Sequence, residues 1–111
     1  MPHNDAMLVF TTVANAVEAE ALVRALLARR LIASGTITAP SKSFYRWEGK
    51  LAEETETVVL LKTRSACLAA LEAAFDELHP YRLPELLAVP VEAGNAKYLA
   101  WLNAETSLAI T

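Results

Sequence analysis

Apolar and polar positions alternate along the first thirty residues in a way that predicts a strand followed by a helix. Residues 7–12 form a short apolar run that ends in threonines, which is typical of a buried strand. Asn15 and Glu18 have the three-residue spacing of a capping box, so a helix is predicted to begin there. Its apolar positions recur at helical spacing and line one face, at Ala19, Leu22, Val23, Leu26 and Leu27. This helix is predicted to cover a sheet.

The next thirty residues predict a long hairpin. Residues 32–39 and 43–47 are rich in β-branched, small and aromatic side chains, and a proline between them predicts one long strand with a bend. Residues 48–50 predict a tight connection, because the glycine at its centre adopts a positive φ readily. Residues 51–63 form the returning strand, which is acidic at first and apolar over Val58–Leu61. The returning strand is therefore predicted to run from solvent into the core.

The remainder of the chain predicts a helix, a strand and a final short helix. Ser65 is predicted to cap the second helix, whose apolar positions recur at helical spacing until residues 79–80 force an exit. Residues 86–91 predict a last strand, and Pro90 places that strand at a sheet edge because proline has no N–H to donate. Residues 94–95 are predicted to start the C-terminal helix.

This order of elements predicts an α+β fold of the ferredoxin-like type, a βαββαβ sandwich with a long bent hairpin and a short C-terminal helix. One domain over residues 7–111 is expected after a flexible tail, residues 1–6. Two helices on one face of a four-stranded sheet leave the other face open, and the mean hydropathy of +0.27 leaves little polar surface to cover it. The free edge of the hairpin adds a second unpartnered surface. An oligomer is therefore predicted.

Charge and composition narrow the classes of partner. The net charge is −3, so no cationic field attracts nucleic acid, and no apolar run approaches the roughly 20 residues of a membrane span. The N-terminus carries no basic residue before its first apolar stretch, as a secretory signal would. Cys67 is the single cysteine, which fits a reducing compartment. A cytoplasmic protein is predicted, with no nucleic-acid or membrane partner.

The chain carries no glycine-rich phosphate loop, no HExxH and no CxxC motif. His79 is the only credible base in the folded body, and Tyr81 and Glu85 follow it closely with further potential ligand atoms. One interpretation is structural: the imidazole interacts with the free carbonyls at a helix end. The other is a weak metal or ligand site, which would need a neighbouring subunit because one chain supplies too few ligands. The tail residue His3 offers an additional copper ligand beside a free amine after removal of Met1.

For each of three further features, the sequence leaves two interpretations open. Tyr45, Trp47 and Trp101 suit packing or a subunit interface, or else a platform for a stacked ligand. Lys62, at the end of an apolar strand, either extends to water or is buried and functional. The acidic residues 53–56 form either a solvated edge that blocks aggregation or a weak cation site.

Four separated motifs resemble the CutA-type divalent-cation-tolerance family. They are Tyr45–Leu51, Leu61–Thr63, His79–Tyr81 with Pro84–Leu86, and Tyr98–Leu102, in the family's order and at similar spacing. The resemblance covers about residues 8 to 103. It implies a small cytoplasmic protein that forms tight homotrimers through the long hairpin and C-terminal elements. It also implies tolerance of copper and other divalent cations, intersubunit clefts like those of PII signalling proteins, and no established enzymatic reaction.

The cysteines that some bacterial members of this family carry are absent. Thr11, Ser34 and Ala74 occupy the matching positions, and Cys67 lies outside that pattern. Soft Cu(I) prefers sulfur ligands, so a copper mechanism that uses those thiols does not apply to this chain. Cys67 is most simply explained as a small residue early in a helix.

The leading hypothesis is a non-enzymatic homotrimer that binds a metal ion or a small ligand between subunits. His79 and Glu85 are the predicted ligands of a weakly held copper or other divalent cation, Lys62 an anion contact, and Trp47 and Tyr81 cleft walls. The alternative is a PII-like signalling or scaffold protein that acts through protein partners without metal. An enzyme with His79 as base is disfavoured, because no nucleophile or second acid has a recognisable spacing.

Overall fold

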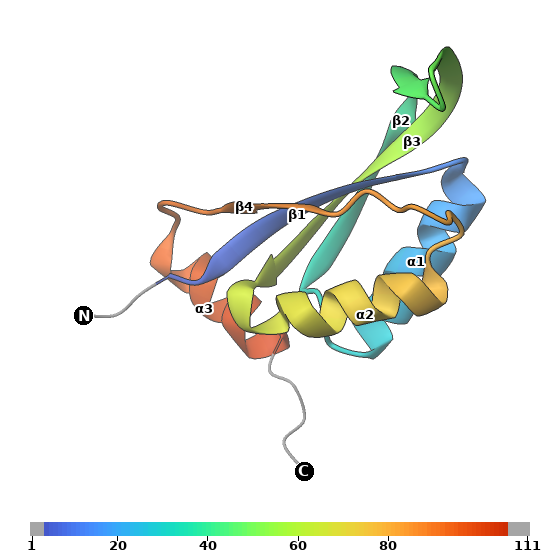
Figure 1. The fold of residues 1–111 in the computed structure, drawn as a ribbon. Helices are drawn as coiled ribbons and strands as arrows, with labels where there is room; N and C mark the ends of the chain where they lie inside the picture. The colour runs from blue at the N-terminus through green and yellow to red at the C-terminus, as the bar shows by residue number, and fades with distance from the viewer. Residues whose placement is uncertain (1–3, 107–111) are drawn as a thin grey trace.

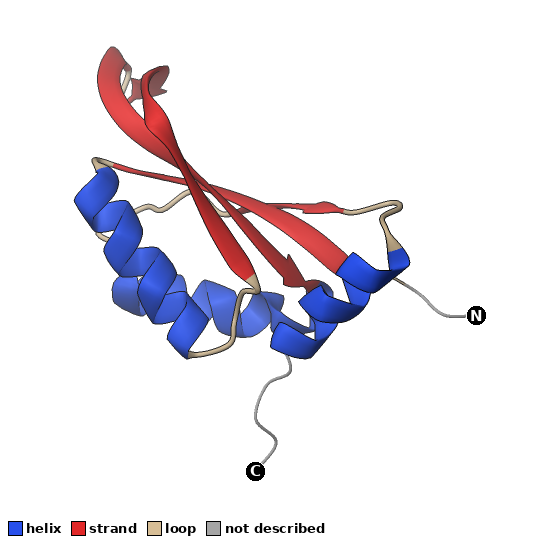
Figure 2. Cartoon of the chain, turned by 180° about the vertical axis from the view of Figure 1, so that it is seen from behind, coloured by secondary structure: helices blue, strands red, loops and turns tan. Residues whose placement is uncertain are grey.

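Four antiparallel strands form one sheet, and two helices pack against one of its faces (Figures 1 and 2). The computed structural model describes residues 4–106. The elements are β1 (Ala6–Val13), α1 (Ala16–Ala28), β2 (Ser34–Trp47), β3 (Lys50–Arg64), the 3₁₀ turn η1 (Ser65–Cys67), α2 (Leu68–Leu78), β4 (Leu87–Pro90) and α3 (Ala96–Glu105). The sheet order is β2-β3-β1-β4, with β4 and its Pro90 at an edge. The predicted α+β class and order of elements are confirmed.

Of the two predicted helix caps, the one at Asn15 is confirmed and the one at Ser65 is wrong. The Asn15 side chain accepts a hydrogen bond from the Glu18 N–H at 2.9 Å, and Glu18 in return accepts from the Ala14 N–H at 3.2 Å. Ser65, in contrast, lies in η1, and its own N–H donates to the Asp5 carbonyl at 2.7 Å. The second helix therefore starts later than predicted, at Leu68, without a side-chain cap.

The hairpin of β2 and β3 is the most extended part of the molecule. Glu48 and Gly49 both adopt positive φ (51° and 78°), which is the backbone of a two-residue hairpin turn. A register shift between Ile37 and Pro40 produces the predicted bend in β2. β1 pairs with β3 only as far as Thr57, so the outer half of the hairpin projects past the rest of the sheet (Figure 1).

The main core lies between the sheet and helices α1 and α2, and the opposite face of the sheet stays open. On the helix side, Val9 and Leu61 are fully buried with Phe75. Because side chains alternate along a strand, the opposite face carries the residues between these positions. They are apolar and partly or largely exposed: Leu8, Phe10, Val58, Leu60, Leu87 and Val89. The exposed apolar face expected from the sequence is therefore present in the described chain, and we call it the open face.

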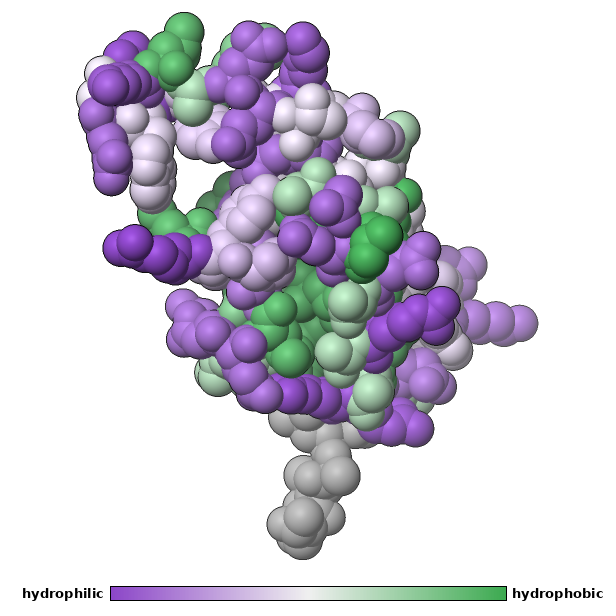
Figure 3. Space-filling view, turned by 90° about the vertical axis from the view of Figure 1, so that its right-hand side faces the viewer, coloured by the Kyte–Doolittle hydropathy of each residue, from purple (hydrophilic) through white to green (hydrophobic). Residues whose placement is uncertain are grey.

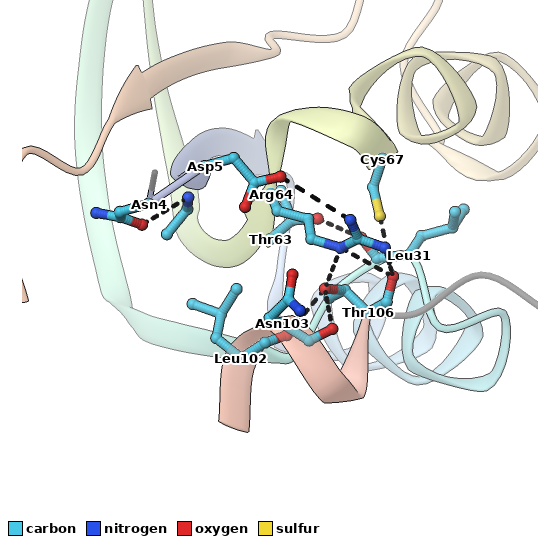
Figure 4. Close-up of polar contacts among 10 residues, drawn as sticks. Asn4, Asp5, Leu31, Thr63, Arg64, Cys67, Leu102, Asn103 and Thr106 are labelled. Carbon is cyan, nitrogen blue, oxygen red and sulfur yellow. Dashed lines mark hydrogen bonds and ion pairs between the residues drawn. The ribbon is translucent and has the colours of Figure 1, made fainter. Parts of the chain in front are cut away.

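Residues 4–6, which the sequence placed in a flexible tail, form contacts with the rest of the described chain. The Asn4 side chain accepts from the Ala6 N–H at 2.8 Å and donates to the Val91 carbonyl at 2.6 Å. Asp5 faces Arg64, whose guanidinium also donates to the carbonyl of Thr106 and so holds the end of α3 (Figure 4). The predicted copper ligand in the tail, His3, lies outside the described residues. No helix within residues 4–106 has the length and apolar character to cross a bilayer.

Candidate functional site

A cleft of about 760 Å³ separates the outer hairpin from the loop between α2 and β4. Figure 3 shows the hairpin standing away from the body, with a hollow between them. β2 and β3 supply one wall, residues 80–85 supply the other, and Thr12 of β1 lies between them. The lining residues are Thr12, Ser43, Phe44, Tyr45, Trp47, Glu54, Glu56, Pro80, Tyr81, Arg82, Leu83 and Glu85.

Three carboxylates face this cleft without a cationic partner. Glu56 is only 6% exposed, and its Oε2 accepts a hydrogen bond from the Tyr81 hydroxyl at 2.7 Å. Glu54 accepts from the Tyr45 hydroxyl at 2.9 Å. Within residues 4–106, none of Glu54, Glu56 and Glu85 forms an ion pair. The cleft therefore concentrates negative charge. Hydrogen bonds from neutral tyrosine hydroxyls compensate for only part of it.

Burial, hydrogen bonds to carboxylates and nearby negative charge together raise the pKa values of the groups around the cleft. Burial raises the pKa of Glu85, and the charge of Glu56 raises it further. Burial also raises the pKa of the Tyr81 hydroxyl well above its usual value, and the hydrogen bond to Glu56 adds to this effect. The hydrogen bond to Glu54 raises the pKa of Tyr45. The carboxylates of Glu54, Glu56 and Glu85 would stabilise a cation in the cleft.

His79 lies beneath the cleft and is 7% exposed. Its Nδ1 accepts a hydrogen bond from the Tyr81 N–H at 3.1 Å, and its Nε2 lies 3.0 Å from the Thr11 hydroxyl. Because Nδ1 is an acceptor, the proton of the neutral ring is on Nε2. The ring also packs between Phe75 and Tyr81, with centroid distances of 5.3 and 5.1 Å. The imidazole therefore joins the core to the loop that forms one wall of the cleft.

The structure brings three of the predicted site residues together and separates one. Trp47, Tyr81 and Glu85 line the same cleft, with His79 directly behind Tyr81. Lys62 lies elsewhere: it is six residues from Glu56 on β3, and its ammonium donates to the Tyr98 hydroxyl at 3.1 Å. Among residues 4–106, no three His, Cys, Asp or Glu side chains gather closely enough to hold a metal ion.

Sequence reasoning treated the acidic run of residues 53–56 as more typical of a solvated edge, and so did not select Glu54 and Glu56. The available signal was their two-residue spacing, which places both side chains on the same face of a strand. Glu53 lies on the other face and pairs with Lys42 at 3.0 Å. Cys67 is buried, and its thiol donates to the Thr106 carbonyl, away from the cleft (Figure 4).

Acidification below about pH 6.5 is expected to destabilise the protein through His79. Burial lowers the pKa of this imidazole below its ordinary value. Between the lowered pKa and about 6.5 the unfolded state binds more protons than the folded state. The contribution of His79 is therefore complete above about pH 6.5 and declines as the pH falls through this window.

Calorimetric Tm values of the parent and of His79→Gln, recorded between about pH 5 and 8, check this expectation. The Tm of the parent should fall more steeply on acidification than the Tm of the variant. His3 is common to both proteins and cancels in the comparison. Equal slopes of Tm against pH in the parent and in His79→Gln would contradict a lowered pKa of His79.

Comparisons with known proteins give a consistent result. The family model of the CutA1 divalent ion tolerance protein matches residues 7–105. The divalent-cation tolerance protein CutA of Pectobacterium atrosepticum is 39% identical over 103 residues, which is 93% of this chain and 94% of that protein. The crystal structure of CutA from Xylella fastidiosa is 39% identical, with a TM-score of 0.89 over 93% of this chain and 99% of that one.

A more distant structure is similar over the same region. The periplasmic divalent cation tolerance protein CutA from Archaeoglobus fulgidus is 32% identical, with a TM-score of 0.88 over 92% of this chain and 99% of that one. That relative is named periplasmic, so the cytoplasmic location of this chain stays a prediction from its composition.

Proposed function

Because this chain belongs to the CutA1 divalent ion tolerance protein family, we propose that it acts as a non-enzymatic protein that binds a cation or a small ligand in the cleft beside its hairpin. The observation that carries this proposal is the group of three carboxylates that line one cleft and form no ion pair within residues 4–106. Burial and, second to it, the charge of Glu56 raise the pKa of Glu85, and a bound cation would offset the repulsion between the two carboxylates. Divalent cation tolerance is the property for which the relatives are named.

Glu85 is the residue to which we assign the metal contact. It is partly buried, lines the cleft and has no ion pair within the described chain. His79 is less suited than Glu85 to bind a metal ion, because the metal would have to compete with the Tyr81 N–H for its Nδ1. With Glu85 and Glu56 as its carboxylate ligands, one chain holds copper or another divalent cation weakly.

A homotrimer is part of this proposal. The open face carries Phe10 and Leu60 at the centre of the sheet and the largely exposed Leu87 and Val89 at its edge. Apolar residues gathered on one face of a strand layer are typical of a surface that another chain covers. The family resemblance implies three copies, and a neighbouring chain would close the open side of the cleft.

Native mass spectrometry of the full chain with Cu(II) tests the proposal. A His3→Ala background removes the copper ligand of the tail. In that background the trimer is expected to retain Cu(II), and Glu85→Gln is expected to lower the affinity about tenfold, which is about 1.4 kcal/mol. Glu72→Gln removes the same charge from the exposed side of α2 and should leave the affinity unchanged.

A trimer that retains no metal in the His3→Ala background would contradict the metal-binding role. That result would favour the PII-like signalling or scaffold alternative. One observation supports this alternative: Leu51 at the end of the hairpin is 74% exposed and Leu83 beside the cleft is 69% exposed, as surfaces for protein partners often are.

A further inference from the structure

Resting on the binding role proposed above, we propose that the cleft also accepts an elongated organic polyamine of the spermidine class, which engages the same carboxylates as a metal ion and fills the rest of the cleft. The cleft has three properties that fit such a molecule: its volume, the separation of its carboxylates, and the aromatic rings along its wall.

The volume suits an organic molecule. The cleft measures about 760 Å³, and clefts that hold drug-sized organic molecules measure roughly 300–1,000 Å³. A metal ion with its ligands at about 2.0–2.6 Å would occupy only a small part of this space. The remaining surface would stay wet and unfilled.

The carboxylates are arranged along the cleft and do not converge on one point. Glu54 and Glu56 are two residues apart on β3, which separates their Cα atoms by about 7 Å. Glu85 faces them from the loop on the other wall. Within residues 4–106 no three acidic, histidine or cysteine side chains gather as a metal requires. Ammonium groups joined by short methylene chains match separated carboxylates, because each carboxylate then receives its own cation.

Aromatic rings provide the apolar part of the site. Tyr45 and Trp47 lie on the hairpin wall, 37% and 51% exposed, and Tyr81 lies on the wall opposite. Methylene groups pack on such rings, and ammonium groups are attracted to the faces of the rings. The two hydroxyls of Tyr45 and Tyr81 already donate to Glu54 and Glu56, so they keep those carboxylates in position for a cation.

Among the described residues, Arg82 is the one basic residue that lines the cleft. Its charge opposes the binding of a polyamine, but three carboxylates outnumber it. Arg82 makes no ion pair with them in the described chain. Removal of its charge is therefore expected to tighten polyamine binding.

Isothermal titration of the full chain with spermidine at low ionic strength tests the proposal. Glu85→Gln is expected to weaken binding about tenfold, and the matched control Glu72→Gln to leave it within about twofold. Arg82→Ala is expected to bind spermidine more tightly, a gain that misfolding would not produce. In a Trp101→Phe background, Trp47 is the only tryptophan, so spermidine should change its fluorescence.

The outcomes separate this inference from the proposed function. The protein could bind copper in a Glu85-dependent way and fail to bind spermidine. That result would overturn the polyamine inference and leave the proposed binding role of the cleft in place. Equal weakening by Glu85→Gln and Glu72→Gln would overturn it as well, because it would show unspecific attraction to an acidic surface. Binding of neither probe would overturn both proposals.

Discussion

If the protein assembles as the proposed trimer, with three times the 12.1 kDa of the chain, Leu60→Glu is expected to convert it into a monomer. Leu60 lies in the middle of the open face, between Phe10 of β1 and Thr36 of β2. If a neighbouring chain covers this face, each substituted copy buries a carboxylate without a partner, which costs several kcal/mol per ion. A trimer would carry three such carboxylates, so the cost is incurred three times in one assembly. Size-exclusion chromatography with light scattering measures the change.

Val17→Glu is the matched control for this experiment. Val17 is 79% exposed on α1, which packs on the other face of the sheet, and it receives the same chemical change. The control protein is expected to keep the mass of the parent. A parent that is monomeric at micromolar concentration, or a Leu60→Glu protein that stays assembled, would contradict the assignment of the open face as the interface.

The sequence predicted the fold well because its signals were local. The Asn15 cap and the two-residue turn at Glu48 and Gly49 depend on residues only a few positions apart. The prediction for Ser65 was wrong because the chain forms a 3₁₀ turn, η1, before the α-helix. Ser65 lies in that turn, where its N–H donates to the distant Asp5 carbonyl, and the α-helix begins at Leu68.

The site was less predictable because its geometry depends on contacts across the chain. The partner of His79 is Thr11, 68 positions away, so the sequence left two roles open for the imidazole. Lys62 was predicted to belong to the site because it lies in one of the family motifs. Six residues of β3 separate it from Glu56, which corresponds to about 20 Å along the strand. The alternation of side chains along β3 would have identified Glu54 and Glu56, but a run of acidic residues is more often a solvated edge.

Phe75→Ala is expected to destabilise the fold and also to weaken binding in the cleft. Phe75 is 2% exposed, so its loss removes buried area and leaves a cavity, at a cost of about 3–5 kcal/mol. It also packs on His79, which in turn packs on Tyr81, whose hydroxyl holds Glu56. Loss of the first ring leaves the imidazole without one of its two neighbours. Guanidinium unfolding at fixed protein concentration measures the first effect, and titration of the folded protein measures the second.

Leu71→Ala separates the two effects. Leu71 is fully buried one helical turn before Phe75, and its truncation costs about 2–5 kcal/mol for the same reason. It makes no ring contact with His79, so the folded Leu71→Ala protein is expected to bind cation in the cleft as the parent does. Equal losses of affinity in the two variants would show that the cleft responds to overall stability. A loss confined to Phe75→Ala would show that the stacked rings of Phe75, His79 and Tyr81 position the cleft wall, because only that variant removes a ring from the stack.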